Sequence, residues 1–475
     1  MRRLWLLSFL VVLAVGQLAV GMRASRTATI TGDEPFYLLT TQSLASDGDL
    51  DLTDEYRHGE ERAFWDGTVP LWKQMEPTPD GRLLAPHDPG LSLLTLPAYE
   101  LGGLRGVQRF LVVLWAAAMA CGAVLARRVG APEWAAMLGA VVVGAGAPGM
   151  VYASQVYPEG PAALCVGVAL LLATGERSRP LPMAAALAAL AWLGVKYVPM
   201  GAIVGVAWAW RFRTDRRALT LAAVPLMVAG GHYLWWHLDT FGGLTPYSTN
   251  VVWAGEGTAT ILDRHLALGG RWYRLYGLFV DARFGLLRWL PAAVLGAWGL
   301  RRRTALHGAV LATAVLLGAF VWITIMGWWF PGRPLVAAFP ALVTLVAVGA
   351  ARLPRVAMAL CLWSLAIAAA VVWSARTGGI QLAVDPFTLG FPLPPKAAFP
   401  DFRHFTAREV LLSLAWAFAI AGGVAIAAQR RRREAARVAR GEGARPARSE
   451  ARTGWGGNPE GQDQRGRAEA PARAP

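Results

Sequence analysis

The chain has 475 residues, of which 55% are hydrophobic and only 16% are charged. A soluble protein carries about a quarter charged residues, so the composition excludes an ordinary soluble domain. Apolar runs long enough to cross a bilayer recur along the chain, and their continuity favours helices over barrel strands. The formal net charge of +15 does not indicate nucleic-acid binding, because the Arg residues form short clusters between apolar runs, as the positive-inside rule predicts.

These runs predict an all-α polytopic membrane protein with about twelve transmembrane helices (range 11–13). The first, from residue 4, is too long for a cleaved signal peptide. A further crossing at 90–104 would reverse the membrane orientation of every later span, so we predict that this segment is an amphipathic element at the outer interface. The predicted spans cover residues 4–22, 107–127, 133–152, 158–174, 181–196, 198–210, 217–236, 284–300, 305–327, 334–351, 355–374 and 409–428.

The segments between the spans differ in charge. With both termini in the cytoplasm, the basic clusters also face the cytoplasm and three long segments lie outside: 23–106, 237–283 and 375–408. The first of them holds 14 of the 31 acidic residues against seven basic ones. Residues 1–429 therefore form the membrane domain, and residues 430–475, rich in Arg, Ala, Gly and Pro, are predicted to be a disordered basic cytoplasmic tail.

The outer loop opens with "TGDEPFYLL", which contains the adjacent carboxylates of Asp33 and Glu34. The pattern is typical of a helix start, with Thr31 as the N-cap and Glu34 as its capping-box partner. It also suits catalysis, since a carboxylate at the membrane surface can act as a general base for an acceptor hydroxyl.

Two further charges interrupt apolar surroundings. Glu159, in "VYPEG", lies at the outer mouth between the third and fourth spans, either as a solvated loop acid or as a functional carboxylate. Lys196, in "GVKYVPMG", either snorkels to the interface or holds a lipid phosphate.

Arg333, in "GWWFPGRPLVAAFPAL", lies on the outer side against the prevailing charge rule. It suits either an interface anchor or a site that stacks a sugar and grips a phosphate. In "HDPGLSLLTLPAY", His87 and Asp88 either cap a helix or face an active site. "HYLWWH", with His232 and His237 five residues apart, suits an aromatic belt rather than a zinc motif.

The chain resembles the GT-C superfamily of membrane glycosyltransferases in the order of four motifs: "GDEPFYL", "HDPGLSLLTLPAY", "VYPEG" and "PGRPLVAAFPAL". It resembles in particular the bacterial relatives of protein O-mannosyltransferases and aminoarabinose transferases. The likeness covers roughly residues 1–430. The chain lacks the extended soluble carboxy-terminal domain of the aminoarabinose enzymes. It also lacks the "WWDYG"-like stretch of oligosaccharyltransferases, which argues against en bloc transfer to Asn.

This resemblance implies a GT-C-like fold with interfacial helices in a periplasmic first loop. It also implies an inverting transfer from a polyprenyl-phosphate sugar to a glycan, lipid or protein acceptor, outside the bacterial inner membrane. The family's acidic positions fall on Asp33, with Glu34 beside it, and on Glu159. For substrate and phosphate contacts we assign Lys196, Arg333, His87 and Tyr157. No metal ligand is assigned, although three carboxylates leave a divalent cation possible as a cofactor.

Two other functions remain open at this point. A transporter or flippase of a lipid-linked saccharide would favour charges near the bilayer midplane and repeat symmetry, and neither is evident in the sequence. A membrane scaffold accounts poorly for the long acidic loop, but the absence of a cavity near Asp33 and Glu159 would favour it.

Overall fold

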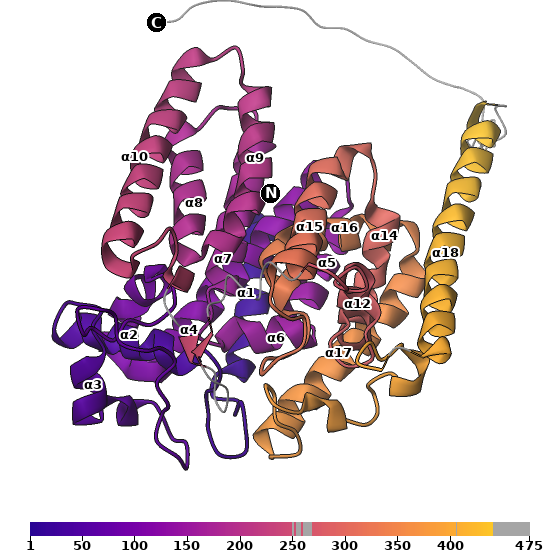
Figure 1. Cartoon of the computed structure of the whole chain (residues 1–475). Coiled ribbons are helices and arrows are strands. Elements are labelled where there is room, and N and C mark those ends of the chain that lie inside the picture. Colours follow the sequence, from indigo (N-terminus) through magenta and orange to yellow (C-terminus); the bar gives the residue numbers. More distant parts are fainter. Residues whose placement is uncertain (249–250, 253–257, 260–267, 405, 440–475) are drawn as a thin grey trace, which may run out of the picture. The chain divides into compact units, whose positions relative to one another are not determined.

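The structure, a computed structural model, describes residues 1–248, 251–252, 258–259, 268–404 and 406–439 (Figure 1). The chain divides into two units, Met1–Val424 and Ala425–Pro475. All the predicted site residues lie in the first unit.

Among the described residues, seven helices are long and apolar enough to cross a membrane, or eight if one bent pair counts as a single span. The seven spans coincide or overlap with α1 (Arg2–Gly16), α4 (Gly90–Arg128), α10 (Arg216–Phe241), α15 (Ala305–Leu316), α16 (Phe339–Arg352), α17 (Pro354–Arg376) and α18 (Ala407–Ala439). The bent pair is α5 (Glu133–Ala145) with α6 (Ala147–Ser154). The chain is therefore a helical membrane protein, as the sequence predicted.

Shorter elements complete the described part of the chain. Two are apolar helices, α7 (Glu159–Ala173) and α8 (Pro180–Leu193). The remaining helices are α2 (Glu34–Ser46), α3 (Thr53–His58), α9 (Val198–Arg211), α12 (Arg274–Val280), α13 (Leu286–Trp289) and α14 (Leu295–Gly299). The strands β1 (Val251–Val252) and β2 (Thr258–Ala259) pair antiparallel.

Helix α4 carries a break where the sequence analysis separates an interfacial element from a span. Its backbone leaves helical geometry at Gly102 (φ −163°, ψ 20°) and Gly103 (φ 53°, ψ −147°). Because a positive φ is open to glycine at little cost, this pair lets the chain turn between residues 90–101 and 104–128. Another break, a bend of 62° between α5 and α6, leads the chain into the loop before α7.

Most residues of α16 are buried, so this helix is central to the first unit. Small residues allow its backbone to approach α14 closely. A Cβ at Gly349 would lie 2.0 Å from the carbonyl oxygen of Leu295, and one at Gly299 would lie 2.0 Å from that of Leu345. Such contacts between small residues are typical of helix packing in membranes, where dispersion rather than water exclusion holds helices together.

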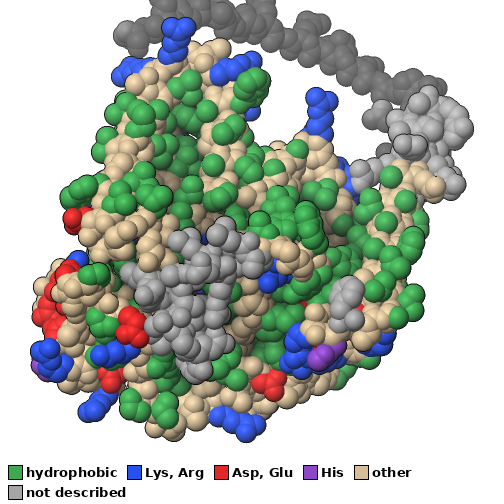
Figure 2. All heavy atoms as spheres, in the orientation of Figure 1, with side chains coloured by type: hydrophobic (Ala, Val, Ile, Leu, Met, Phe, Trp, Pro, Cys, Tyr) green, Lys and Arg blue, Asp and Glu red, His purple; other side chains and the backbone are tan. Residues whose placement is uncertain are grey.

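Hydrogen bonds tie the basic turns to one another. Arg128, at the end of α4, donates to the Thr174 hydroxyl after α7 (3.0 Å), and Arg211 donates to the Gly175 carbonyl (3.0 Å). Ser178 donates to Asp215 before α10 (2.9 Å). The top of the view in Figure 2 accordingly shows Lys and Arg side chains.

The remaining turns make a second set of contacts. Ser154 donates to the Ala19 carbonyl after α1 (3.0 Å), the Gly21 amide donates to Gln108 of α4 (3.1 Å), and Arg376 donates to the Leu18 carbonyl (2.8 Å). In Figure 1 helices α2 and α3 of the acidic loop lie at the bottom of the view, away from the tips of α9 and α10. Successive connections along the chain thus alternate between two groups of turns, and the turns of each group contact one another.

Two predicted segments fall partly outside the described residues. Helix α18 continues into the predicted tail as far as Ala439, whereas residues 440–475 of that tail are not described. The outer segment 237–283 is described except at 249–250, 253–257 and 260–267.

Candidate functional site

Four residues that the sequence analysis singled out from separate motifs meet in one ionic cluster. Arg333 donates from Nε to Glu159 Oε1 (2.9 Å) and from Nη2 to Asp33 Oδ2 (3.2 Å). Lys196 donates from Nζ to the same Glu159 oxygen (3.2 Å). We call Asp33, Glu159, Lys196 and Arg333 the ionic cluster.

Three members stand at the start of an element, and Lys196 lies in a short turn between two helices. Asp33 occupies the N-cap position of α2, and Glu159 is the first residue of α7. Lys196 lies in the 3₁₀ turn Val195–Tyr197 between α8 and α9, and Arg333 begins the 3₁₀ turn Arg333–Ala338 before α16. The cluster therefore forms where four connections of the second group converge.

Glycines set up two of these positions. Gly32, before Asp33, has φ 63°, and Gly332, before Arg333, has φ 89°. Both angles lie in the left-handed region that other residues adopt only at a cost. At Gly32 space is also limiting, since a Cβ would lie 2.7 Å from the Tyr157 hydroxyl. The local "GD" and "GR" pairs are thus needed to turn the chain into the cluster.

Burial differs across the cluster. The side chains of Glu159 and Arg333 are 1% and 4% exposed, whereas Lys196 is 17% and Asp33 is 29% exposed. Two cations balance two carboxylates, as a buried charge requires. Among the described residues, Glu159 Oε2 has no hydrogen-bond partner. Asp33 and Lys196 are therefore the members that an incoming molecule can reach most easily.

Aromatic rings surround the two cations. The Arg333 guanidinium lies 3.8 Å from the ring centroid of Tyr157 and 5.4 Å from that of Trp329. Lys196 Nζ lies 4.6 Å from the ring centroid of Trp322. Both cations pair with acids and lie against aromatic rings, which favours a binding site over an interface anchor for Arg333 and a snorkelling chain for Lys196. Tyr157, assigned to substrate contacts, lies directly on Arg333.

A side-chain relay extends the cluster from Asp33. Gln74 Nε2 donates to Asp33 Oδ1 (3.3 Å), and His87 Nε2 lies 3.0 Å from Gln74 Oε1. Because an amide oxygen only accepts, the hydrogen of His87 is on Nε2. His87 thus reaches Asp33 through Gln74, which the sequence analysis missed because nothing in "WKQME" distinguishes it from an ordinary surface amide.

The relay places the neutral imidazole of His87 near the ionised carboxylate of Asp33. Burial lowers the pKa of His87 to about 4, which keeps the ring uncharged at neutral pH. Burial is the largest single influence and alone would raise the pKa of Asp33, but the combined electrostatic effects of Arg333, His87 and Lys196 and the hydrogen bond from Arg333 hold that pKa below its usual value. Asp33 is therefore a carboxylate at neutral pH.

Glu34 is turned away from the ionic cluster. Its Oε1 accepts from the Val156 amide (2.9 Å) and its Oε2 from the Thr31 amide (3.2 Å), so it joins the start of α2 to the loop before Glu159. The bond to Thr31 is half of the predicted capping box. The other half is wrong, because the N-cap position belongs to Asp33 and no side chain caps the helix.

Asp88 and His237 form a separate buried pair. Asp88 Oδ1 accepts from the Tyr233 hydroxyl (2.8 Å) and lies 3.0 Å from His237 Nε2. The predicted cap at Asp88 is wrong, because α4 begins at Gly90 with no side-chain cap. The aromatic-belt reading is wrong for His237, which is fully buried. The partners are 149 positions apart in the chain, so no local sequence pattern could pair them.

The carboxylates at the cluster do not fit a metal ion in this arrangement. Arg333 occupies Asp33 and Glu159, and backbone amides occupy both oxygens of Glu34. A divalent cation would have to displace the guanidinium of Arg333 from both carboxylates.

A small hollow borders Glu34. Its volume is about 230 Å³, which includes space open to solvent. It is lined by Met22, Ala24, Thr29, Glu34, Gln108, Val151, Ser154, Gln155 and Leu382. Of the predicted site residues only Glu34 borders it, so this hollow carries no functional argument.

Comparison with protein-family models, with curated proteins and with solved structures gives no match to this chain. The resemblance to GT-C enzymes therefore rests on the short motifs alone.

Proposed function

We propose that this protein is an inverting glycosyltransferase that moves a sugar from a polyprenyl-phosphate donor to an acceptor on the outer side of the membrane. One observation carries the proposal. Four charged residues from four distant motifs converge within hydrogen-bond distance, although each is costly near a membrane and none is needed to complete a helix. Charges gathered in this way are typical of functional sites.

In this proposal Arg333 and Lys196 bind the donor phosphate. A guanidinium recognises phosphate oxygens through paired N–H groups, and an ammonium adds a point charge. In the absence of donor, Glu159 and Asp33 neutralise both cations. A bound phosphate would compete for them and stabilise the charge that develops on the departing polyprenyl phosphate.

Asp33 is the proposed general base. It is ionised and is the most exposed member of the cluster. A base with a lowered pKa is weak, but phosphate binding would offset the influence of Arg333 and raise the pKa of Asp33 when the acceptor must lose its proton. His87 and Gln74 would hold the carboxylate in place. A single displacement at the anomeric carbon then inverts its configuration.

The proposal includes a GT-C-like arrangement with about twelve crossings in a bacterial inner membrane, both termini being cytoplasmic. It is supported by the two groups of turns: the basic turns after α4, α7 and α9 contact one another, while the turns that carry the ionic cluster contact the acidic first loop. By the positive-inside rule, the cluster faces outward.

The test is transfer of labelled sugar from polyprenyl-phosphate donors in membranes that contain wild-type protein or Asp33→Asn. Loss of a general base lowers the rate by about 10²–10⁴-fold. Asp80→Asn, an exposed acid of the same loop, is the matched control and should retain wild-type rates. Wild-type transfer by Asp33→Asn would refute the base assignment.

The same experiment separates the alternatives. Movement of lipid-linked saccharide across vesicles without any covalent product would favour a flippase. A membrane scaffold predicts neither transfer nor flux. Either outcome would refute the transferase proposal.

A further inference from the structure

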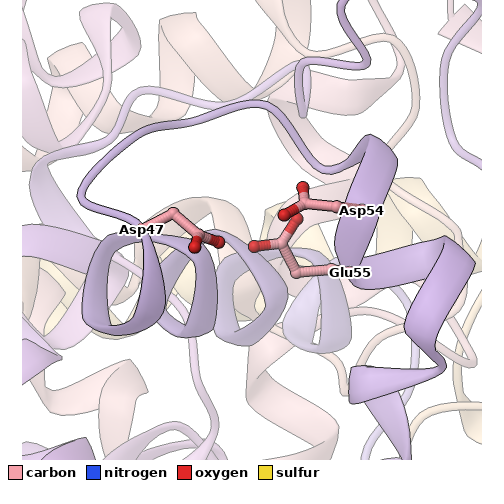
Figure 3. Close-up of side chains that lie close together, drawn as sticks. All are labelled: Asp47, Asp54 and Glu55. Atoms are coloured by element: carbon pink, nitrogen blue, oxygen red, sulfur yellow. The ribbon is translucent and has the colours of Figure 1, made fainter.

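A second group of carboxylates lies in the acidic loop, apart from the ionic cluster. Asp47 follows the last residue of α2, and Asp54 and Glu55 belong to the first turn of α3. One oxygen from each of the three side chains lies within 4.8 Å of the others. Figure 3 shows the carboxylates of Asp54 and Glu55 turned toward that of Asp47 across the gap between the two helices.

Glu55 is the residue that demands an explanation. It is 0% exposed, and neither of its carboxylate oxygens has a hydrogen-bond partner among the described residues. An unpaired carboxylate in such a position is costly, and two further acids beside it increase the cost. A cation bound between the three carboxylates would remove this cost.

The neighbouring acids behave differently. Asp49 accepts from the Ser43 hydroxyl (3.1 Å) and the Asp51 amide (2.9 Å). Asp51 in turn accepts from the Thr53 hydroxyl (2.7 Å) and the Leu83 amide (2.8 Å). These two acids shape the loop, and their bonds bring Asp47 opposite α3.

We propose that Asp47, Asp54 and Glu55 bind a calcium ion. The set offers only hard oxygen ligands, without nitrogen or sulfur, and three negative charges for a divalent ion. Oxygens on opposite sides of Ca²⁺ lie about 4.6–5.2 Å apart, and a mutual spacing within 4.8 Å is compatible with three ligands of one such ion. Mg²⁺ requires tighter, near-octahedral geometry, which three carboxylates from two separate helices fit less well.

The site is partly open to water, which can complete the coordination of the ion. Asp47 is exposed, so water can supply the remaining ligands of the six to eight that Ca²⁺ takes, as in weak extracellular sites with Kd on the order of 10⁻⁴–10⁻³ M. The ion would join the end of α2 to α3 and fix the helix whose other end carries Asp33. The site stands independently of the proposed transferase activity.

The experiment uses the full chain in detergent after removal of divalent ions with a chelator. Terbium binding is followed by luminescence excited through Tyr56, the neighbour of Glu55, and CaCl₂ in the millimolar range is then added as competitor. Thermal unfolding with and without CaCl₂ is the second readout. Wild type should bind terbium, release it to calcium and melt at a higher temperature with calcium.

The variants are Glu55→Gln and Asp54→Asn, with Glu76→Gln, an exposed acid of the same loop, as matched control. Removing one of three charged ligands should weaken binding by about tenfold or more. Without calcium, Glu55→Gln should melt no lower than wild type, because neither carboxylate oxygen of Glu55 has a hydrogen bond to lose among the described residues. Absence of calcium binding in wild type overturns the proposal, as does unchanged binding by Glu55→Gln or an equal loss in Glu76→Gln.

Discussion

Glu34 offers a prediction that follows directly from its surroundings. Its side chain is 1% exposed, and burial raises its pKa from 4.5 to about 7 in spite of the two backbone amides that it accepts. A folded-state pKa above the unfolded value means that the folded state binds more protons between the two values. The contribution of Glu34 to stability is therefore fully present below pH 4.5 and is lost as the pH rises through 7. The difference between the two pKa values corresponds to about 3 kcal/mol.

Glu34→Gln removes this titration. Relative to wild type, its unfolding free energy should increase by about 3 kcal/mol between pH 4.5 and pH 8. The Gln side chain has one carbonyl oxygen where Glu34 has two carboxylate oxygens, so it cannot replace the bonds from both the Thr31 and the Val156 amides. This loss lowers the unfolding free energy of the variant by an amount that does not vary with pH. His87 acts in the opposite direction, because its lowered pKa makes stability rise with pH between about 4 and 6.5. Only the difference between variant and wild type isolates Glu34.

The assay is equilibrium unfolding in mixed detergent micelles at a series of pH values. Glu76→Gln, an exposed acid in the same loop, should run parallel to wild type throughout. Parallel profiles for Glu34→Gln and wild type would refute the reasoning, since they would mean that Glu34 titrates alike in the folded and unfolded states.

Three further predictions concern the buried charges. Arg333→Met leaves Glu159 without its nearest guanidinium and should lower the unfolding free energy by about 3–5 kcal/mol. Adding Glu159→Gln should restore much of this stability but no transfer activity. A double variant as unstable as Arg333→Met would contradict this prediction. Lys196→Met, at a partly exposed position, should raise KM for the lipid-linked donor by about tenfold with a smaller effect on kcat; transfer kinetics with an unchanged KM would contradict the phosphate role. Asp88→Asn weakens the only acceptor described for His237 Nε2 and should lower the unfolding free energy by about 1–3 kcal/mol in the same micelle assay, whereas unchanged stability would show that the pair contributes nothing to folding.

The amino-acid sequence alone determined the helical membrane class. Apolar runs must form helices in lipid, because no other open segment satisfies its backbone hydrogen bonds there. It also singled out Asp33, Glu159, Lys196 and Arg333, since charges are rare beside such runs and need a partner. The local pattern in "TGDEP" further predicted the bond between Glu34 and the Thr31 amide.

Only the tertiary structure decided which partner each charge takes. Adjacent residues at a helix start point in different directions, so Asp33 enters the cluster while Glu34 binds the loop before α7. The contacts of Gln74 with Asp33, and of His237 with the Asp88 carboxylate, join residues far apart in the chain. No local pattern encodes such pairs, because packing of whole helices sets the distances over which hydrogen bonds and charges act.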